Sequence, residues 1–208
     1  MRTPRKIWNE FWIFLIRRAH YSRNSKALRH REEFPYLLHN LGLKGLGAEI
    51  GVFEGYFSEF LLQRWKGRLL LSIDPYREYS GETYADVLNK KQAIQDQIYA
   101  KTLNRLRGFG SRSLLLRGES LEVAKLLPAE SLDFVYIDGN HSYPAVSADL
   151  RAWYPLLVPG GLMAGDDWKM PSVQKAVKEF CADRQLEIKM AGNLKDPDNF
   201  YFLKPAGG

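Results

Sequence analysis

Three aspartates follow two apolar runs of the chain, at places where metal-binding or catalytic groups are common. Asp138 comes directly after the run LDFVYI, and the pair Asp166 and Asp167 follows GLMAG. Carboxylates brought together without a counter-ion repel one another, and a hard divalent cation with oxygen ligands removes that repulsion. The three aspartates therefore indicate a metal site, with Mg²⁺ as the first candidate. Alternatively, Asp138 orients a ligand or caps a turn, and Asp166 or Asp167 caps a helix that enters at Pro171.

A histidine lies close to the first of these acids. His141 stands three residues after Asp138 in the segment DGNHSY. Imidazole exchanges a proton near neutral pH, so His141, together with Asp138, is a candidate for taking a proton from a substrate hydroxyl. A structural role for this histidine is an equally good interpretation, and both remain open.

Two other strand-like runs end in residues that suit a nucleoside-like ligand. Glu49, Gly51 and Gly55 lie in EIGVFEG, where glycine allows a sharp turn and a close approach of the ligand. Asp74 ends the next run, 74 − 49 = 25 residues later, where a carboxylate can accept hydrogen bonds from a ribose diol. In the alternative, the glycines only make a tight strand-to-helix turn.

The glycines do not form a dinucleotide-binding fingerprint. Phe53 stands where the second glycine of Gly-x-Gly-x-x-Gly should be, and the neighbouring Glu54 would repel a pyrophosphate. A ligand with an ammonium group and an adenosine, but no phosphate, fits better. Glu119 and Ser120 follow a third run and suit the edge of an adenine base, although Ser120 could equally be the N-cap of a helix over 120–127.

The elements that position these residues alternate along the chain after residue 30. Apolar strand runs separated by helices predict a mostly parallel sheet covered on both faces, which is a Rossmann-like, doubly wound α/β fold with three αβα layers. A final pair of runs, 186–190 and 200–203, predicts a C-terminal antiparallel hairpin. The expected strands are 47–52, 68–73, 113–117, 132–137 and 161–164, and the expected helices are 56–66, 82–107, 120–127, 143–157 and 171–183.

The positive charge of the chain is concentrated in an N-terminal arm. Residues 1–31 hold nine of the 30 basic residues and one of the 24 acids, so residues 32–208 carry 21 − 23 = −2. Apolar residues at helical spacing over 5–20 predict an amphipathic helix in this arm. We expect it to dock on the domain as a lid or a homodimer contact, or to lie on an anionic membrane surface. The lack of a basic excess over residues 32–208 argues against nucleic acid as a partner.

Cysteine content and hydropathy limit the class of protein further. The single Cys181 excludes an internal disulfide framework and a cysteine-rich zinc site. The longest apolar run, FWIFLI at 11–16, is far shorter than the roughly 20 residues that cross a bilayer. We therefore expect a cytoplasmic protein, with peripheral contact at the inner face of the membrane through the N-terminal helix as an option.

The motifs taken together resemble a known family. The segments GAEIGVFEGYFSEFL, SIDPY, RGES, LDFVYIDGNHSY and DLRAWYPLLVPGGLMAGDDW are similar to successive motifs of class I methyltransferases, which use S-adenosylmethionine (SAM). The resemblance is closest to the small-molecule O-methyltransferase branch of macrocin and catechol O-methyltransferase-like enzymes, and it covers residues 46–204. It implies methylation of a small-molecule or sugar hydroxyl, with Mg²⁺ or another divalent cation held by the acids. The residues implied for SAM are Glu49, Gly51, Gly55, Asp74, Glu119, Ser120 and Asp138, and those implied for the metal are Asp138, Asp166 and Asp167.

The sequence departs from this family at two positions near the expected reaction centre. His141 stands where the catechol-type enzymes carry a lysine, and Asn140 stands where macrocin-type relatives commonly have an acid. The general base is therefore open. Two other functions compete with the main one: a SAM- or nucleotide-binding module without catalysis, and a membrane-associated methyltransferase of a lipid-linked saccharide.

Overall fold

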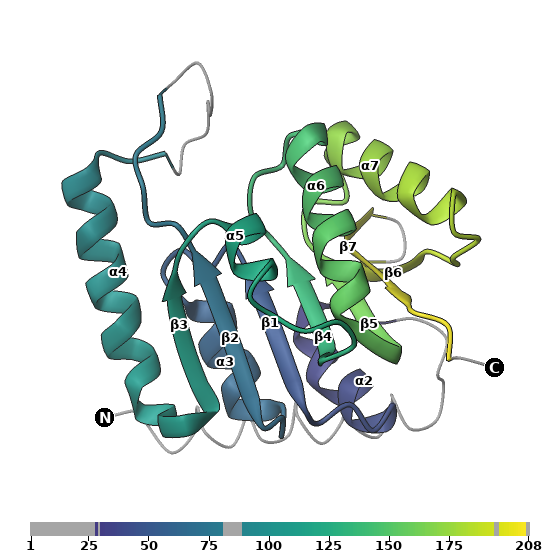
Figure 1. The fold of residues 1–208 in the computed structure, drawn as a ribbon, viewed down its shortest axis with the longest axis horizontal. Helices are drawn as coiled ribbons and strands as arrows, with labels where there is room; N and C mark the ends of the chain where they lie inside the picture. Colours follow the sequence, from purple (N-terminus) through teal and green to yellow (C-terminus); the bar gives the residue numbers. More distant parts are fainter. Residues whose placement is uncertain (1–27, 29, 81–88, 194–195, 207–208) are drawn as a thin grey trace.

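The computed structural model describes residues 28, 30–80, 89–193 and 196–206. Its centre is a seven-stranded sheet with the strand order β3-β2-β1-β4-β5-β7-β6 (Figure 1). Strands β1 to β5 are parallel, whereas β7 is antiparallel to β5 and β6 is antiparallel to β7. The predicted α/β fold with a C-terminal antiparallel hairpin is thus confirmed. The strands are β1 (Leu46–Ile50), β2 (Leu69–Asp74), β3 (Ser113–Arg117), β4 (Leu132–Ile137), β5 (Leu157–Gly165), β6 (Lys189–Asn193) and β7 (Asp196–Leu203).

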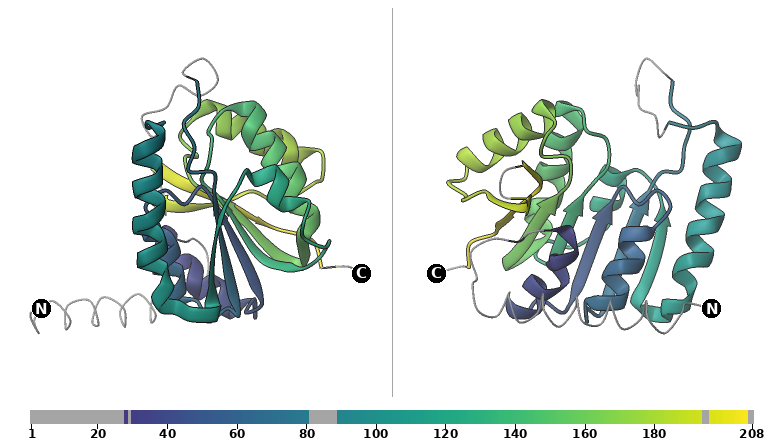
Figure 2. Two further views of the ribbon diagram at one scale, coloured as in Figure 1. Left: turned by 60° about the vertical axis from the view of Figure 1, so that its left-hand side comes forward. Right: turned by 180° about the vertical axis from the view of Figure 1, so that it is seen from behind.

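Helices cover both faces of the sheet. Helices α2, α3 and α4 lie on one face, and α5, α6 and α7 lie on the other (Figures 1 and 2). The helices are α2 (Phe34–Asn40), α3 (Tyr56–Arg64), α4 (Gln92–Leu106), α5 (Ser120–Ala124), α6 (Tyr143–Trp153) and α7 (Pro171–Ala182), with short 3₁₀ turns η1 (Arg31–Glu33), η2 (Arg107–Arg112) and η3 (Tyr154–Leu156).

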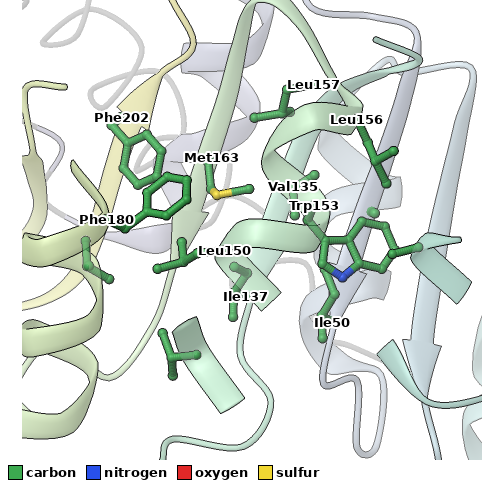
Figure 3. Packing of buried hydrophobic residues seen from close by; sticks show 14 of the residues in the cluster. Ile50, Val135, Ile137, Leu150, Trp153, Leu156, Leu157, Met163, Phe180 and Phe202 are labelled. Carbon is green, nitrogen blue, oxygen red and sulfur yellow. The ribbon is translucent and has the colours of Figure 1, made fainter. Parts of the chain in front are cut away.

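The core consists of two apolar layers, one on each face of the sheet. On one face, Leu150 and Trp153 of α6 pack toward Val135 and Ile137 of β4, and Met163 of β5 lies beside them (Figure 3). All five side chains are at most 5% exposed. Burying an aliphatic or aromatic side chain of this size contributes about 1.5–3 kcal/mol to stability, so this packing fixes the strand ends that carry the polar residues.

The boundaries differ from the predicted ones where proline and the hairpin intervene. The helix predicted over 143–157 ends at Trp153, because Pro155 has no N–H to continue the hydrogen-bond ladder. Strand β5 consequently begins at Leu157, four residues before the predicted start at 161. The stretch AGNLKDPDN at 191–199, which joins the two runs of the predicted hairpin, lies largely in β6 and β7, where Ala191 pairs with Asn199. The amphipathic helix predicted over 5–20 lies outside the described residues.

The N-terminal side of the described chain is attached to the far edge of the sheet. Leu28 is 2% exposed, forms a parallel bridge with Ala191, and accepts the N–H of Gly192 at 3.0 Å. The packed domain therefore includes Leu28 and Arg31, both of which lie in the segment expected to be an arm. None of the helices in the described part of the chain has the length and apolar character needed to cross a membrane.

Candidate active site

The carboxyl ends of β1, β2 and β4 open into a cleft with a volume of about 530 Å³. Five of the residues predicted to bind the cofactor line it: Gly51, Asp74, Glu119, Ser120 and Asp138. Glu122 and Asp149 add two more acids, and Arg77 is the single basic side chain among the described residues of its lining. A cleft with this charge favours a cationic ligand over a phosphate.

The carboxylate of Asp74 fixes the loop that follows β1. Its Oδ2 atom accepts the backbone N–H groups of Val52 and Phe53, both at 2.9 Å, and Oδ1 accepts that of Tyr76 at 2.8 Å. Burial raises the pKa of Asp74, although these three hydrogen bonds oppose the shift. A carboxylate has about four lone-pair sites, so Asp74 can accept one further donor, such as a ribose hydroxyl.

Gly51 is required by the close approach of β4. Its φ is +84°, and a Cβ atom at this position would collide with the backbone carbonyl of Asp138. The Asp138 N–H donates to the carbonyl of Ile50 at 2.7 Å, which holds the two strand ends together. The glycine therefore allows the loop after β1 and the loop after β4 to meet at one side of the cleft.

Two of the predicted cofactor residues do not line the cleft. Glu49 is 1% exposed and accepts the hydroxyl of Ser58, which lies 3.0 Å from that of Ser72. Burial raises the pKa of Glu49 to about 8, so this group is mostly neutral at pH 7. Gly55 is the left-handed N-cap of α3, and a Cβ there would lie 2.7 Å from the methyl carbon of Thr102. Both residues therefore support the loop after β1 from its buried side.

The far side of the cleft contains a buried acid that the sequence did not single out. Asp149 of α6 is 6% exposed and accepts the hydroxyl of Ser120, which in turn accepts the indole N–H of Trp153 at 2.8 Å. Burial raises the pKa of Asp149 to about 6. Ser120 is the first residue of α5 and Glu119 is its N-cap, with no side-chain capping hydrogen bond, so the alternative role of Ser120 as N-cap is wrong.

The residues predicted for metal binding and catalysis meet beyond β4 and β5. His141 Nε2 lies 2.8 Å from Asp167 Oδ2 and 3.9 Å from Asp138 Oδ1. These two carboxylates raise the pKa of His141 to about 10. Burial raises the pKa of Asp166 to about 6, and repulsion by Asp138 adds to the shift. The backbone of Asp167 is left-handed, with φ of 57°, a strained conformation that aspartate tolerates better than most residues.

A guanidinium occupies one side of this acidic cluster. Arg31 Nη1 donates to Asp166 Oδ2 at 2.9 Å and lies 3.7 Å from Asp138 Oδ2. The same guanidinium lies 4.9 Å from the centre of the Phe57 ring. Sequence reasoning counted Arg31 as one of the arm's nine basic residues, and no local motif marks it as a site residue.

The donor set that could hold a cation therefore differs from the predicted one. One ligand atom from each of Asp138, His141 and Asp167 lies within 4.8 Å of the others, which is close enough to share one ion. Asp166 instead faces Arg31. The fold brings all three predicted aspartates to one place, but pairing with the arginine leaves a mixed set of two carboxylates and one imidazole.

Comparison with known proteins identifies the family of this chain. Residues 48–168, more than half of the chain, match the family described as "Methyltransferase domain". An uncharacterised protein, R132, of Acanthamoeba polyphaga mimivirus is 27% identical over 142 residues, which are 66% of this chain and 60% of the viral protein. The chain thus spans less than two thirds of that relative.

Solved structures share the fold at low sequence identity. The O-methyltransferase NovP superposes with a TM-score of 0.63 at 18% identity, over 84% of this chain and 77% of that one. The O-methyltransferase TomG from Streptomyces achromogenes, solved in complex with SAM, gives a TM-score of 0.56 at 16% identity, over 85% and 79%. The chain therefore has the fold of these O-methyltransferases, as the sequence predicted. The chain belongs to the methyltransferase domain family.

Proposed function

We propose that this protein transfers the methyl group of SAM to a hydroxyl of a small molecule or sugar, with the help of a divalent cation. The observation that carries the proposal is the acidic cleft, which ends at the cluster of Asp138, His141 and Asp167. Its acids suit the sulfonium and ammonium groups of SAM. Asp74 lies where a ribose can bind, and Glu119 and Ser120 lie where an adenine can bind.

Methyl transfer from a sulfonium is an in-line displacement, so the main task of the protein is to place the acceptor oxygen behind the methyl carbon. Asp138 is suited to this task because it lines the cleft and also belongs to the acidic cluster. A bound cation would lower the pKa of the acceptor hydroxyl and fix its oxygen. Asp138, His141 and Asp167 are the residues that we propose to hold it.

His141 cannot be a metal ligand and a general base at once, because Nε2 offers one lone pair. The two neighbouring carboxylates raise the pKa of His141 to about 10, so the imidazole must lose a proton before it can act either as a base or as a ligand. We assign His141 to the cation in place of the proton-accepting role predicted from the sequence, because one of its ring nitrogens lies within 4.8 Å of carboxylate oxygens of both Asp138 and Asp167. Asp138 has two oxygens, so it can hold a cation through one and take the acceptor's proton through the other.

The test is calorimetric titration of the full chain with S-adenosylhomocysteine (SAH), with NAD⁺ as the control ligand. Micromolar SAH binding that is lost in Asp74→Ala is expected, with no response to NAD⁺. Glu187→Ala is the matched control, since this side chain is 80% exposed and belongs to neither the cleft nor the cluster. Transfer of labelled methyl from SAM to a panel of sugar and phenolic hydroxyls then tests the acceptor. Failure to bind SAH would favour a different ligand for this cleft.

A further inference from the structure

The ion pair between Arg31 and Asp166 divides the acidic cluster into two parts. Asp166 is held by the guanidinium at 2.9 Å, whereas Asp138, His141 and Asp167 remain close enough to share an ion. We infer that Arg31 determines which cation this site prefers, because it withholds Asp166 and leaves a ligand set that contains an imidazole. This inference rests on the proposed cation-assisted methyl transfer.

Arg31 is held by several partners from different elements. Besides Asp166 after β5 and Asp138 after β4, its guanidinium interacts with the buried Tyr136 and lies over the Phe57 ring. Its backbone is attached to the sheet three residues earlier, where Leu28 pairs with β6. The guanidinium is therefore positioned by contacts with α3, β4 and the residues after β4 and β5, and not by one surface ion pair.

The two ligand sets differ in the ions they favour. Mg²⁺ takes oxygen ligands almost exclusively, so a cluster of three aspartates suits it well. Imidazole favours later first-row ions, and affinity for a site with nitrogen ligands rises from Mn²⁺ through Co²⁺ to Ni²⁺. With Asp166 paired to Arg31, the available set is Asp138, His141 and Asp167, which favours an ion such as Co²⁺ over Mg²⁺.

Removal of the guanidinium has two effects that can be separated. Loss of one positive charge beside the cluster strengthens the binding of every divalent cation to a similar extent. Release of Asp166 offers a carboxylate that can replace the imidazole of His141, and this exchange of a nitrogen ligand for an oxygen ligand strengthens the binding of Mg²⁺ relative to that of Co²⁺. A change in the ratio of the two affinities therefore reports the recruitment of Asp166, whereas a parallel change reports charge alone.

The experiment titrates the full chain with MgCl₂ and with CoCl₂ by calorimetry, and follows Co²⁺ also by its visible absorption. The wild-type chain is expected to bind Co²⁺ more tightly than Mg²⁺. Arg31→Gln is expected to tighten Mg²⁺ binding by about tenfold relative to Co²⁺, in the range typical of groups around a metal site. Asp166→Asn in the Arg31→Gln background should remove that gain. Arg31→Lys, which keeps a positive charge near Asp166, should stay close to the wild-type selectivity.

An unchanged Mg²⁺ to Co²⁺ ratio in Arg31→Gln would overturn the inference, as would a gain that persists in the double variant. SAH binding and thermal unfolding of each variant show whether it is folded. If no variant binds either ion but SAH still binds, the proposed cation site and the role of Arg31 are both wrong, whereas the proposed SAM site is supported. If SAH does not bind while the ion selectivity shifts as expected, the proposed methyl transfer fails and the role of Arg31 stands.

Discussion

The Oδ2 atom of Asp74 accepts the backbone N–H of Phe53 at 2.9 Å, so a residue at the end of β2 holds the loop that follows β1. Asp74→Asn replaces one charged oxygen by an amide that donates, and some of the three backbone N–H groups lose their acceptor. Hydrogen bonds to a charged group contribute about 1.5–3 kcal/mol each, so we expect the free energy of unfolding to fall by about 2 kcal/mol. Urea unfolding measures this. An unchanged midpoint would mean that the loop is held by other contacts.

Gly51 and Gly160 offer a matched pair of substitutions, because both have left-handed φ angles, +84° and +77°. A Cβ at Gly51 would strike the carbonyl of Asp138, whereas nothing described lies within 4 Å of a Cβ at Gly160. Gly160→Ala should lower the free energy of unfolding by about 1 kcal/mol, because alanine is strained at this backbone conformation. Gly51→Ala should cost more than about 3 kcal/mol and should weaken SAH binding. If denaturant unfolding showed the same loss of stability in both variants, the close contact between the two strand ends would be ruled out.

Asp149 is predicted to make stability depend on pH. Its folded pKa of about 6 lies above the usual value of 3.8, so the folded state favours the protonated carboxyl. Stability should therefore fall as pH rises from about 4 to about 6, by an amount on the order of 2 kcal/mol. Asp149→Asn keeps an acceptor for the Ser120 hydroxyl and carries no charge, so it should be more stable than wild type at pH 7.5 and similar at pH 4.

Urea unfolding of wild type and Asp149→Asn at several pH values measures this difference. Asp183→Asn is the control, because Asp183 is exposed and lies just after α7, away from the cleft. A constant difference between wild type and Asp149→Asn from pH 4 to pH 7.5 would refute the assignment of a raised pKa to Asp149.

Leu28 tests whether the packed domain extends into the basic N-terminal segment. The side chain is 2% exposed in the apolar layer beneath α2 and α3, so Leu28→Ala should lower the free energy of unfolding by about 2–5 kcal/mol. Leu126→Ala removes the same atoms from a side chain that is 80% exposed and should change stability by less than about 0.5 kcal/mol. Thermal unfolding compares the two, and a loss of similar size in both variants would contradict the packing of Leu28.

The fold could be predicted in detail because its determinants are local. Runs such as LDFVYI are apolar on both faces, which is typical of a strand in a covered parallel sheet, and the structure places β4 there. The predicted boundaries were wrong where a single residue decides them. Pro155 ends the helical hydrogen-bond ladder, although the apolar periodicity of the segment continues to Leu157.

The site could be predicted only in part, because strand-end position does not determine where a side chain points. The residues after β2, β3 and β4 reach the cleft, as expected for the carboxyl ends of parallel strands. Glu49 precedes the end of β1 by one residue, so the strand alternation turns its side chain into the core. Arg31 and Asp166 are 135 residues apart, and no local pattern couples them.

The pairing of Leu28 with Ala191 also constrains the order of events during synthesis. Ala191 leaves the ribosome 191 − 28 = 163 residues after Leu28, and Asp166 leaves it 135 residues after Arg31. The nascent chain can therefore assemble β1 to β4 and the loop held by Asp74 before Asp166 and Ala191 have been made. The loops after β1, β2 and β4 are thus encoded in a continuous early segment, whereas the attachment of the N-terminal segment at Leu28 is completed only when the last hairpin has been made.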